Sequence, residues 1–326
     1  MSEKLLEISG LSVCYEGEQI LNNICFSVEK GETVGIAGES GSGKSTLLRA
    51  ILRLMGKNGS ITGGQITFRG EELTGMSEKK LRSLCGSEIG MIFQNTGASL
   101  CPTRKIGAQI CESVRAHEKR CGFITPISGG MSGRKSRREI KDMTLRRFAD
   151  MGLSDGETIW NSYPSSLSGG MNQRVISAMG LMNRPKWVIA DEPTKGLDAI
   201  LRRQVYRVLK EISETDTEGM IVITHDIALA GALCDRLMVL YKGSIMEAGE
   251  TKTILEHPAH PYTKGLIASL PGKGMNPIGR AVRKKGGNSG CSFYPRCPHA
   301  VDACKNGRIP EAELPDGRKV RCVRYA

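Results

Sequence analysis

One short stretch constrains this chain more than any other. Residues 38–45 read Gly-Glu-Ser-Gly-Ser-Gly-Lys-Ser and fit the pattern G-x-x-x-x-G-K-[ST]. The apolar residues 33–37 before it are typical of a buried strand, and residues 46–52 after it are typical of a helix. Glycines between a strand and a helix let successive backbone N–H groups surround phosphate oxygens. The stretch therefore predicts a phosphate-binding loop in an α/β fold, because a Gly/Ser-rich surface turn would not explain both flanks.

The side chains of this loop match what a nucleotide requires. We expect Lys44 to reach the β- and γ-phosphates and Ser45 to hold Mg²⁺. The start of the following helix adds N–H donors and the positive end of the helix dipole. The residues that we expect to contact nucleotide here are Gly38, Ser40, Gly41, Gly43, Lys44, Ser45 and Thr46.

Apolar periodicity predicts where the other elements lie. Strands are expected at residues 5–15 (broken at Ser9-Gly10), 20–28, 63–68, 89–93, 187–192 and 220–224, and a hairpin at 236–248. Helices are expected at 78–84, 106–119, 137–151 and 200–212. Residues 121–136 are rich in Gly and Ser, so we expect an exposed loop there.

Length and charge limit the broad class of the protein. With 326 residues, the chain can form one large domain with an appendage, or two domains. It holds no run of about 18 apolar residues, and residues 1–7 lack the apolar core of a signal peptide, so we expect a cytoplasmic protein. Residues 272–326 hold 12 Lys/Arg and 4 Asp/Glu, which is +8 of a total net charge of +12. Such a basic tail suits nucleic acid, anionic lipid or an acidic partner, and charge alone does not choose among them.

Two carboxylates follow a second apolar strand. Trp187 to Ala190 is continuously apolar, as in a parallel sheet covered on both faces, and Asp191 and Glu192 come next. Asp191 is placed to orient the shell of a bound Mg²⁺, and Glu192 to polarise a water molecule. A pair of solvated acids is the common alternative, but a phosphate loop earlier in the chain argues against it.

A second glycine pair precedes a helix. Residues 167–174 read Leu-Ser-Gly-Gly-Met-Asn-Gln-Arg, and an apolar helix follows. The glycines would expose backbone N–H groups, and Ser168 can cap the helix, so we predict a second anion site. Residues 128–131, Ser-Gly-Gly-Met, imitate this pattern, but neither Gln-Arg nor an apolar helix follows them.

Three single residues near predicted strand ends have weaker signals. Tyr15 can stack on adenine or simply pack on the edge of a sheet. Gln94 can coordinate Mg²⁺ or the attacking water, although a lone glutamine is usually polar surface. His225 ends the strand at 220–224 and is well placed to contact a γ-phosphate, although a single histidine is more often structural.

Taken in order, these motifs resemble the ATP-binding subunit of ABC transporters over about residues 5–250. The resemblance implies that Tyr15 stacks on adenine and that Gln94 links Mg²⁺ to the membrane subunit. It also implies that Glu192 is the general base and that His225 is the switch. The residues that would act on the ATP held by an opposing subunit are Ser168, Gly169, Gly170 and Gln173. The resemblance also identifies Asp198, in the turn at residues 194–198, as the residue of the family's D-loop.

The resemblance implies a fold and a mechanism as well. The fold is a P-loop α/β core with an antiparallel β subdomain and a helical subdomain at about residues 95–182. We expect this ATPase domain to span residues 1–255 and a small Cys-rich extension to span 256–326. Two ATP molecules would be enclosed when two such domains close, and hydrolysis would reopen them. Asn95-Thr96 and Lys195-Gly196 depart from the family pattern without removing a catalytic group, which weakens any assignment of substrate.

The C-terminal residues resemble the extension of dipeptide, oligopeptide and nickel importers. The similarity rests on His260-Pro-Tyr-Thr263, Leu270-Pro271 and four cysteines, Cys291, Cys297, Cys304 and Cys322. Four thiolates suit a [4Fe–4S] cluster or Zn²⁺, and the spacing lacks the C-x₂-C pairs usual for zinc. The resemblance favours an iron–sulfur cluster, with zinc and four unliganded thiols as alternatives. The other seven cysteines are scattered and read as small buried hydrophobic residues.

We therefore expect an ATP- and Mg²⁺-dependent ATPase that powers the uptake of peptides, nickel or a related small solute. The implied partners are a second, paralogous ATPase subunit, two transmembrane permeases and an extracytoplasmic binding protein, with no nucleic acid. The protein would sit peripherally on the cytoplasmic face of the membrane. The alternative is a soluble ABC ATPase that acts on nucleic acid or in cluster assembly. A non-hydrolysing regulatory module is disfavoured by the intact Glu192 and His225.

Overall fold

The computed structural model describes residues 3–92, 99–121, 135–270, 274–276, 278–279 and 290–325. The chain forms two compact units, Met1–Thr74 with Ile221–Ala326, and Gly75–Met220. Gln94 and the Ser-Gly-Gly-Met stretch at 128–131 lie outside the described residues.

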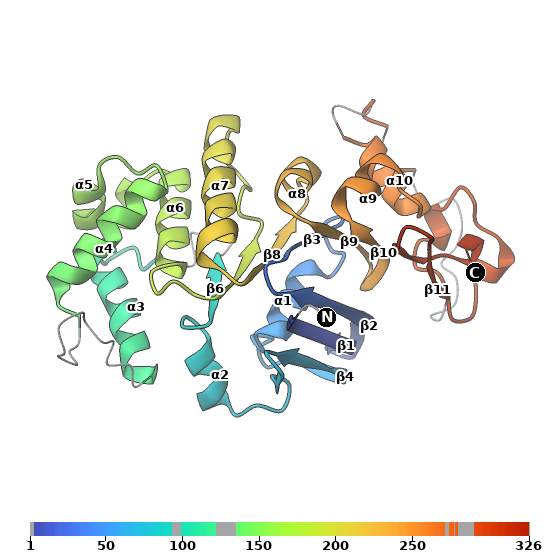
Figure 1. The fold of residues 1–326 in the computed structure, drawn as a ribbon, viewed down its shortest axis with the longest axis horizontal. Coiled ribbons are helices and arrows are strands. Elements are labelled where there is room, and N and C mark those ends of the chain that lie inside the picture. Colours follow the sequence, from blue (N-terminus) through green and yellow to red (C-terminus); the bar gives the residue numbers. More distant parts are fainter. Residues whose placement is uncertain are drawn as a thin grey trace. The chain divides into compact units, whose positions relative to one another are not determined.

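An antiparallel sheet occupies the N-terminal part of the first unit (Figure 1). Its order is β2-β1-β4-β5, formed by β1 (Lys4–Tyr15), β2 (Glu18–Glu29), β4 (Gly59–Phe68) and β5 (Glu71–Glu72). Apolar side chains of β1 such as Leu6 and Ile8 are buried, as their alternation predicts. The register of β1 shifts between Ile8 and Leu11 against β2 and between Ser9 and Ser12 against β4, and Gly10 has φ +67°. The predicted break at Ser9-Gly10 is therefore a bulge within one strand.

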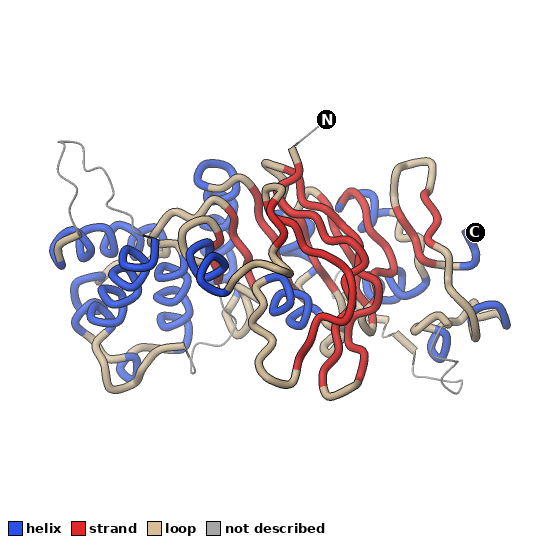
Figure 2. The backbone as a smooth tube through the Cα atoms, turned by 90° about the horizontal axis from the view of Figure 1, so that it is seen from below, coloured by secondary structure: helices blue, strands red, loops and turns tan. Residues whose placement is uncertain are grey.

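A second sheet runs through the first unit in the order β11-β12-β10-β9-β3-β8. The strands of the chain are drawn in red in Figure 2. Its strands are β3 (Thr33–Ala37), β8 (Gly219–Thr224), β9 (Arg236–Tyr241), β10 (Ser244–Glu250), β11 (Glu311–Glu313) and β12 (Lys319–Arg321). All residues of β3 and β8 are buried, and β3 pairs in parallel with β9. The helices of this unit are α1 (Lys44–Ile51), α8 (Ile227–Leu233), α9 (Thr251–Glu256) and α10 (Pro261–Ala268). This buried parallel strand pair is the base from which the phosphate loop rises.

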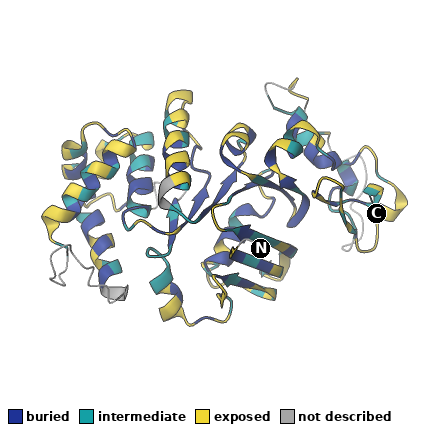
Figure 3. Cartoon of the chain, in the orientation of Figure 1, coloured by how far each residue is buried: buried dark blue, intermediate teal, exposed yellow. Residues whose placement is uncertain are grey.

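The second unit is mainly helical and carries two parallel strands, β6 (Ile89–Ile92) and β7 (Trp187–Asp191). Its helices are α2 (Glu78–Leu84), α3 (Ile106–Cys121), α4 (Arg137–Asp150), α5 (Gly156–Asn161), α6 (Gly169–Gly180) and α7 (Ala199–Glu211). Buried residues line the inner faces of these helices (Figure 3). Glycine permits two close approaches: a Cβ on Gly107 would lie 2.3 Å from the Trp160 ring, and one on Gly180 would lie 2.2 Å from the Met91 carbonyl.

The C-terminal residues dock onto β10 through a buried acid. The Glu247 carboxylate is fully buried, and it accepts hydrogen bonds from the backbone N–H groups of Ala259 (2.9 Å) and His260 (2.8 Å) and from Arg318 (3.2 Å). A small apolar cluster of Ala259, Val320 and Cys322 packs beside it. Removing one partner of such a buried pair would leave an uncompensated charge, so this ion pair fixes the docking.

His260 caps α10 in its neutral form. Its Nδ1 accepts a hydrogen bond from the Tyr262 N–H at 3.0 Å, and only 1% of the residue is exposed. Burial lowers the pKa of His260 to about 4, because the charged imidazolium is poorly solvated there. Protonation of Nδ1 would also remove the acceptor that the cap requires.

We expect the stability of the protein to fall as the pH is lowered from about 6.5 to about 4. Over that range His260 takes up a proton in the unfolded chain but stays neutral in the folded protein. This difference lowers the free energy of unfolding by roughly 3 kcal/mol. His260→Asn keeps a capping acceptor and removes this titration. Urea denaturation of both proteins at several pH values measures the difference, and an equal loss in the variant would contradict the lowered pKa.

Candidate nucleotide-binding site

The phosphate loop leaves β3 and enters α1 with a backbone that only glycine allows. Gly43 is the N-cap of α1 with φ 105°, and no side chain caps that end. A Cβ at Gly38 would lie 2.2 Å from the Leu240 carbonyl oxygen, and one at Gly43 would lie 2.8 Å from the Leu21 side chain. The predicted strand–loop–helix arrangement is therefore present, with an open helix N-terminus suited to an anion.

Lys44 lies inside the curve of the loop. Its Nζ donates to the carbonyls of Gly38 (2.7 Å) and Glu39 (3.0 Å) and lies 3.5 Å from the Ser42 hydroxyl. The residue is buried, with 8% of its surface exposed. The ammonium group is thus held within the loop rather than in bulk water. Ser45 and Thr46, in the first turn of α1, are half-buried.

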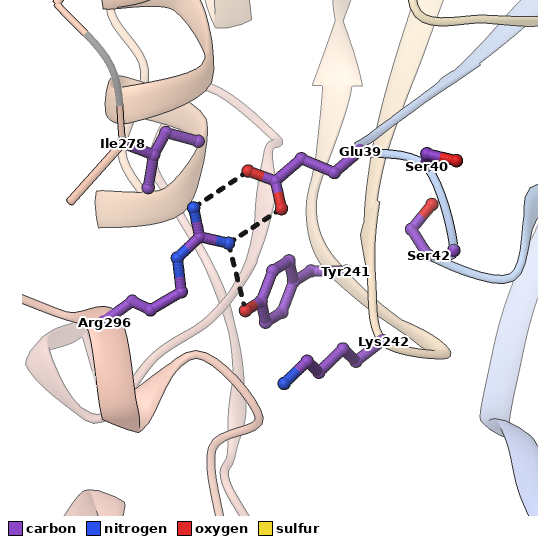
Figure 4. Close-up of a pocket in the computed structure, with 8 residues that line it drawn as sticks. Glu39, Ser40, Ser42, Tyr241, Lys242, Ile278 and Arg296 are labelled. Atoms are coloured by element: carbon purple, nitrogen blue, oxygen red, sulfur yellow. Dashed lines mark hydrogen bonds and ion pairs between the residues drawn. The ribbon is translucent and has the colours of Figure 1, made fainter. Parts of the chain in front are cut away.

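A cavity of about 320 Å³ borders the loop (Figure 4). Its lining comes from the loop, from the β9–β10 turn and from the C-terminal residues: Glu39, Ser40, Gly41, Ser42, Tyr241, Lys242, Ile278 and Arg296. Sequence reasoning assigned no role to Glu39 or Arg296, which here form a two-pronged ion pair. The signal that could have pointed to this pair is Glu39 itself, because an acid inside a phosphate-binding loop requires a compensating positive charge.

Tyr15 packs on the antiparallel sheet. It is paired with Gly59 of β4, and a Cβ at Gly59 would lie 2.7 Å from its ring. Its hydroxyl is buried and has no hydrogen-bond partner among the described residues. Tyr15 is half-buried at the end of β1, an inner strand of the sheet, and adenine stacking stays a prediction.

In the second unit, Asp191 and Glu192 lie at the end of β7. They are buried, with exposed fractions of 7% and 8%. Glu192 has φ 48°, in the left-handed region that a glutamate rarely adopts, and its carbonyl accepts the Lys195 N–H at 3.1 Å. Strain of this kind persists where the surroundings enforce it, and it is common at functional sites.

The second glycine pair begins α6 as predicted. The Ser168 hydroxyl accepts the Met171 N–H at 3.2 Å, which confirms the expected cap. Ser168 and Gly169 are exposed, and a Cβ at Gly169 would meet nothing within 4 Å. Gly170 is half-buried, and Gln173 is buried in the helix.

Asp198 and His225 lie at exposed ends of elements. The Asp198 carboxylate caps α7 by accepting the N–H groups of Ile200 and Leu201, both at 2.9 Å. Beside it, Ile200 is 73% exposed. His225 follows β8 and is exposed. The phosphate loop, Tyr15 and His225 belong to the first unit, while Asp191, Glu192, Asp198 and the glycine pair belong to the second.

The four C-terminal cysteines lie in the first unit. Cys297, Cys304 and Cys322 are buried, and the Cys291 N–H donates to the Cys304 carbonyl at 2.9 Å. Burial, and to a lesser extent the three other thiols, raises the pKa of Cys291 to about 11. Across the described ranges, however, no three His, Cys, Asp or Glu residues are grouped as ligands of one metal ion. The predicted iron–sulfur cluster is therefore not confirmed.

Two protein families match the chain. The ABC transporter family matches residues 21–195, and the C-terminal region of oligopeptide/dipeptide transporters matches residues 246–304. Within the described ranges, no helix combines the length and the apolar character needed to cross a membrane.

Similar proteins cover almost the whole chain. The dipeptide transport ATP-binding protein DppD of Escherichia coli is 36% identical over 98% of this chain and 96% of its own. The oligopeptide transport ATP-binding protein OppD of Salmonella typhimurium is 36% identical over 98% of this chain and 93% of its own. Among solved structures, the dimeric ATP-binding cassette MJ0796 bound to ADP and Pi has a TM-score of 0.64 at 26% identity. It covers 76% of this chain and 98% of its own.

These matches confirm the predicted P-loop α/β fold with an antiparallel subdomain and a helical subdomain. They also confirm an ATPase of the type that is coupled to transport. The chain belongs to the dipeptide/oligopeptide family of ABC transporter ATP-binding subunits.

Proposed function

We propose that this ATPase powers the uptake of dipeptides or oligopeptides through a membrane importer. The observation that carries the proposal is the match of residues 246–304 to the C-terminal region of oligopeptide/dipeptide transporters. DppD and OppD, named for dipeptide and oligopeptide transport, align with nearly the full chain and support the same cargo class. Nickel uptake and a nucleic-acid role have only the sequence resemblance and the basic tail in their favour.

Within this function, we assign the phosphate loop and Lys44 to the phosphates of ATP. The support is the open N-terminus of α1 and the buried ammonium group beside it. Ser45 supplies an oxygen ligand of the kind that Mg²⁺ prefers, Asp191 would orient the shell of the metal ion, and the metal would neutralise charge on the phosphates. Gln94, outside the described residues, keeps its expected role as a further Mg²⁺ ligand. Tyr15 is assigned to the adenine ring.

We assign Glu192 as the general base and His225 as the switch that contacts the γ-phosphate. The support for Glu192 is its buried carboxylate on a strained backbone at the end of a strand. A carboxylate at this position can accept a proton from a bound water molecule. His225 is exposed at the end of β8, where a ligand can reach it.

A second ATPase subunit, which we expect to be a paralogue, would complete the site. The exposed start of α6 supports a partner there, with Ser168, Gly169, Gly170 and Gln173 acting on the partner's ATP. Asp198 and the exposed Ile200 next to it support the same contact, since an isolated apolar side chain gains from burial. The remaining partners are two transmembrane permeases and an extracytoplasmic binding protein. The chain would then lie peripherally on the cytoplasmic face of the membrane.

We also propose that the chain divides into two functional parts near residue 255. Residues 1–255, with the helical subdomain at about 95–182, would hydrolyse ATP. Residues 256–326 would form the extension, which is supported by its own small apolar cluster and by the match that begins at residue 246.

The four C-terminal thiols are proposed to hold an iron–sulfur cluster in preference to zinc. The support is the chemistry of the donor set, because four thiolates are the usual ligands of such a cluster. The three other thiols also contribute to the raised pKa of Cys291. A bound cluster would add stability to so small a module.

Glu192→Gln should keep the affinity for ATP and lower the rate of hydrolysis by at least about a hundredfold, because the amide cannot accept a proton. In a strain that lacks the gene, the wild-type gene should restore uptake of a labelled dipeptide, and the variant should not. Glu157→Gln, at an exposed ion pair with Lys141, is the matched control and should behave as wild type.

Full turnover in the Glu192 variant would remove Glu192 as the base. Restored uptake of nickel but not of peptide would change the cargo class. ATPase activity stimulated by nucleic acid, with no effect on uptake, would favour the soluble alternative.

Protein purified without oxygen should be brown and contain about four iron and four sulfide per chain. Cys304→Ser should lose the iron, whereas Cys25→Ser, at an exposed cysteine of β2, should keep it. Stoichiometric zinc without iron would overturn the assignment.

A further inference from the structure

One residue of the phosphate loop is held by the C-terminal extension. The Glu39 N–H donates to the Tyr262 hydroxyl at 2.9 Å. Its carboxylate accepts two hydrogen bonds from Arg296, Nη1–Oε2 at 2.7 Å and Nη2–Oε1 at 3.0 Å (Figure 4). Its carbonyl accepts from Lys44 Nζ at 3.0 Å. Glu39 therefore connects the extension directly to the lysine of the loop.

The guanidinium of Arg296 is itself held in place. It lies 5.9 Å from the ring centroids of Tyr241 and Phe293. Its Nη1 is 3.4 Å from the Tyr241 hydroxyl, and its Nε donates to the Gly279 carbonyl at 3.0 Å. The rings of Tyr241, Tyr262 and Phe293 pack on one another with centroids 4.5–5.4 Å apart. A planar, two-pronged pair on such a base loses little side-chain entropy, unlike a common surface salt bridge.

Charge gives this contact a consequence for nucleotide binding. Glu39 is the second residue of the phosphate loop, so a carboxylate lies in a loop that would bind a triphosphate. Without compensation, its negative charge would repel that ligand. The hydrogen bonds to Arg296 hold that carboxylate at the border of the cavity and offset its charge. The Glu39 carbonyl meanwhile shares the ammonium group of Lys44, so a shift of Glu39 would also shift the environment of the lysine.

We propose that Arg296 is a positioning residue for nucleotide binding, which acts by holding and neutralising Glu39. The extension is then part of the architecture of the ATP site, in addition to any cluster that it carries. This inference rests on the assignment of the phosphate loop to ATP. It is independent of the cargo and of the cysteines.

A double-mutant cycle on the purified full chain tests the proposal. The Kd of a fluorescent ATP analogue and the KM and kcat of hydrolysis are measured for wild type, Arg296→Ala, Glu39→Gln and the double variant. Arg296→Ala should raise Kd and KM about threefold to tenfold, the range for a partly exposed charge pair. In the Glu39→Gln background the same change should alter Kd less than twofold, because no carboxylate remains to neutralise. Arg296→Lys should recover part of the affinity.

The control is Arg324→Ala, at an exposed arginine of the same extension, which should leave Kd unchanged. An unchanged Kd in Arg296→Ala, or an equal loss in both backgrounds, overturns the proposal, since equal losses would reflect packing alone. If Arg296→Ala does not fold, Arg296→Lys takes its place in the same cycle, with the same two outcomes. Failure of the wild-type chain to bind the analogue would instead refute the nucleotide assignment itself.

Discussion

The turn between β9 and β10 carries the contact on which the first unit depends. The Gly243 N–H donates to the Ser42 carbonyl of the phosphate loop, and the Gly243 carbonyl accepts the Asn22 N–H of β2, both at 2.8 Å. A Cβ on Gly243 would lie 1.9 Å from the Ile20 carbonyl, so only glycine permits this approach. One backbone residue therefore joins the antiparallel sheet, the buried sheet and the loop. The loop keeps its shape because three elements are fixed around it.

Local patterns allowed the elements and the motif positions to be predicted. The sequence placed β3 at its observed bounds, located α2 correctly, and predicted a hairpin at 236–248, where β9 and β10 form. The predicted strand at 63–68 begins four residues after the observed start of β4 at Gly59, because residues 59–62 have little apolar periodicity. Ser168 was identified as a cap because capping depends on residues next to each other in the chain.

Contacts between distant residues could not be predicted in this way. Glu39 and Arg296 are separated by 257 positions, and neither belongs to a periodic pattern. The left-handed backbone of Glu192 and the packing of Tyr15 on Gly59 depend on surroundings that the local sequence does not encode. The cysteine spacing indicated a donor set, but four thiols in sequence do not determine whether their sulfur atoms converge.

The short strands β11 and β12 end the buried sheet at its C-terminal side. β12 pairs with β10 at Glu247 and Ala248, and β11, with the sequence Glu-Ala-Glu, pairs with β12. An uncovered strand offers a row of free backbone donors and acceptors to any other chain, and short charged strands are a common protection against such pairing. The extension covers the edge of β10 in this way. A chain cut at residue 256 would uncover the backbone groups with which β10 pairs with β12, and it would remove all three hydrogen-bond donors of the buried Glu247 carboxylate.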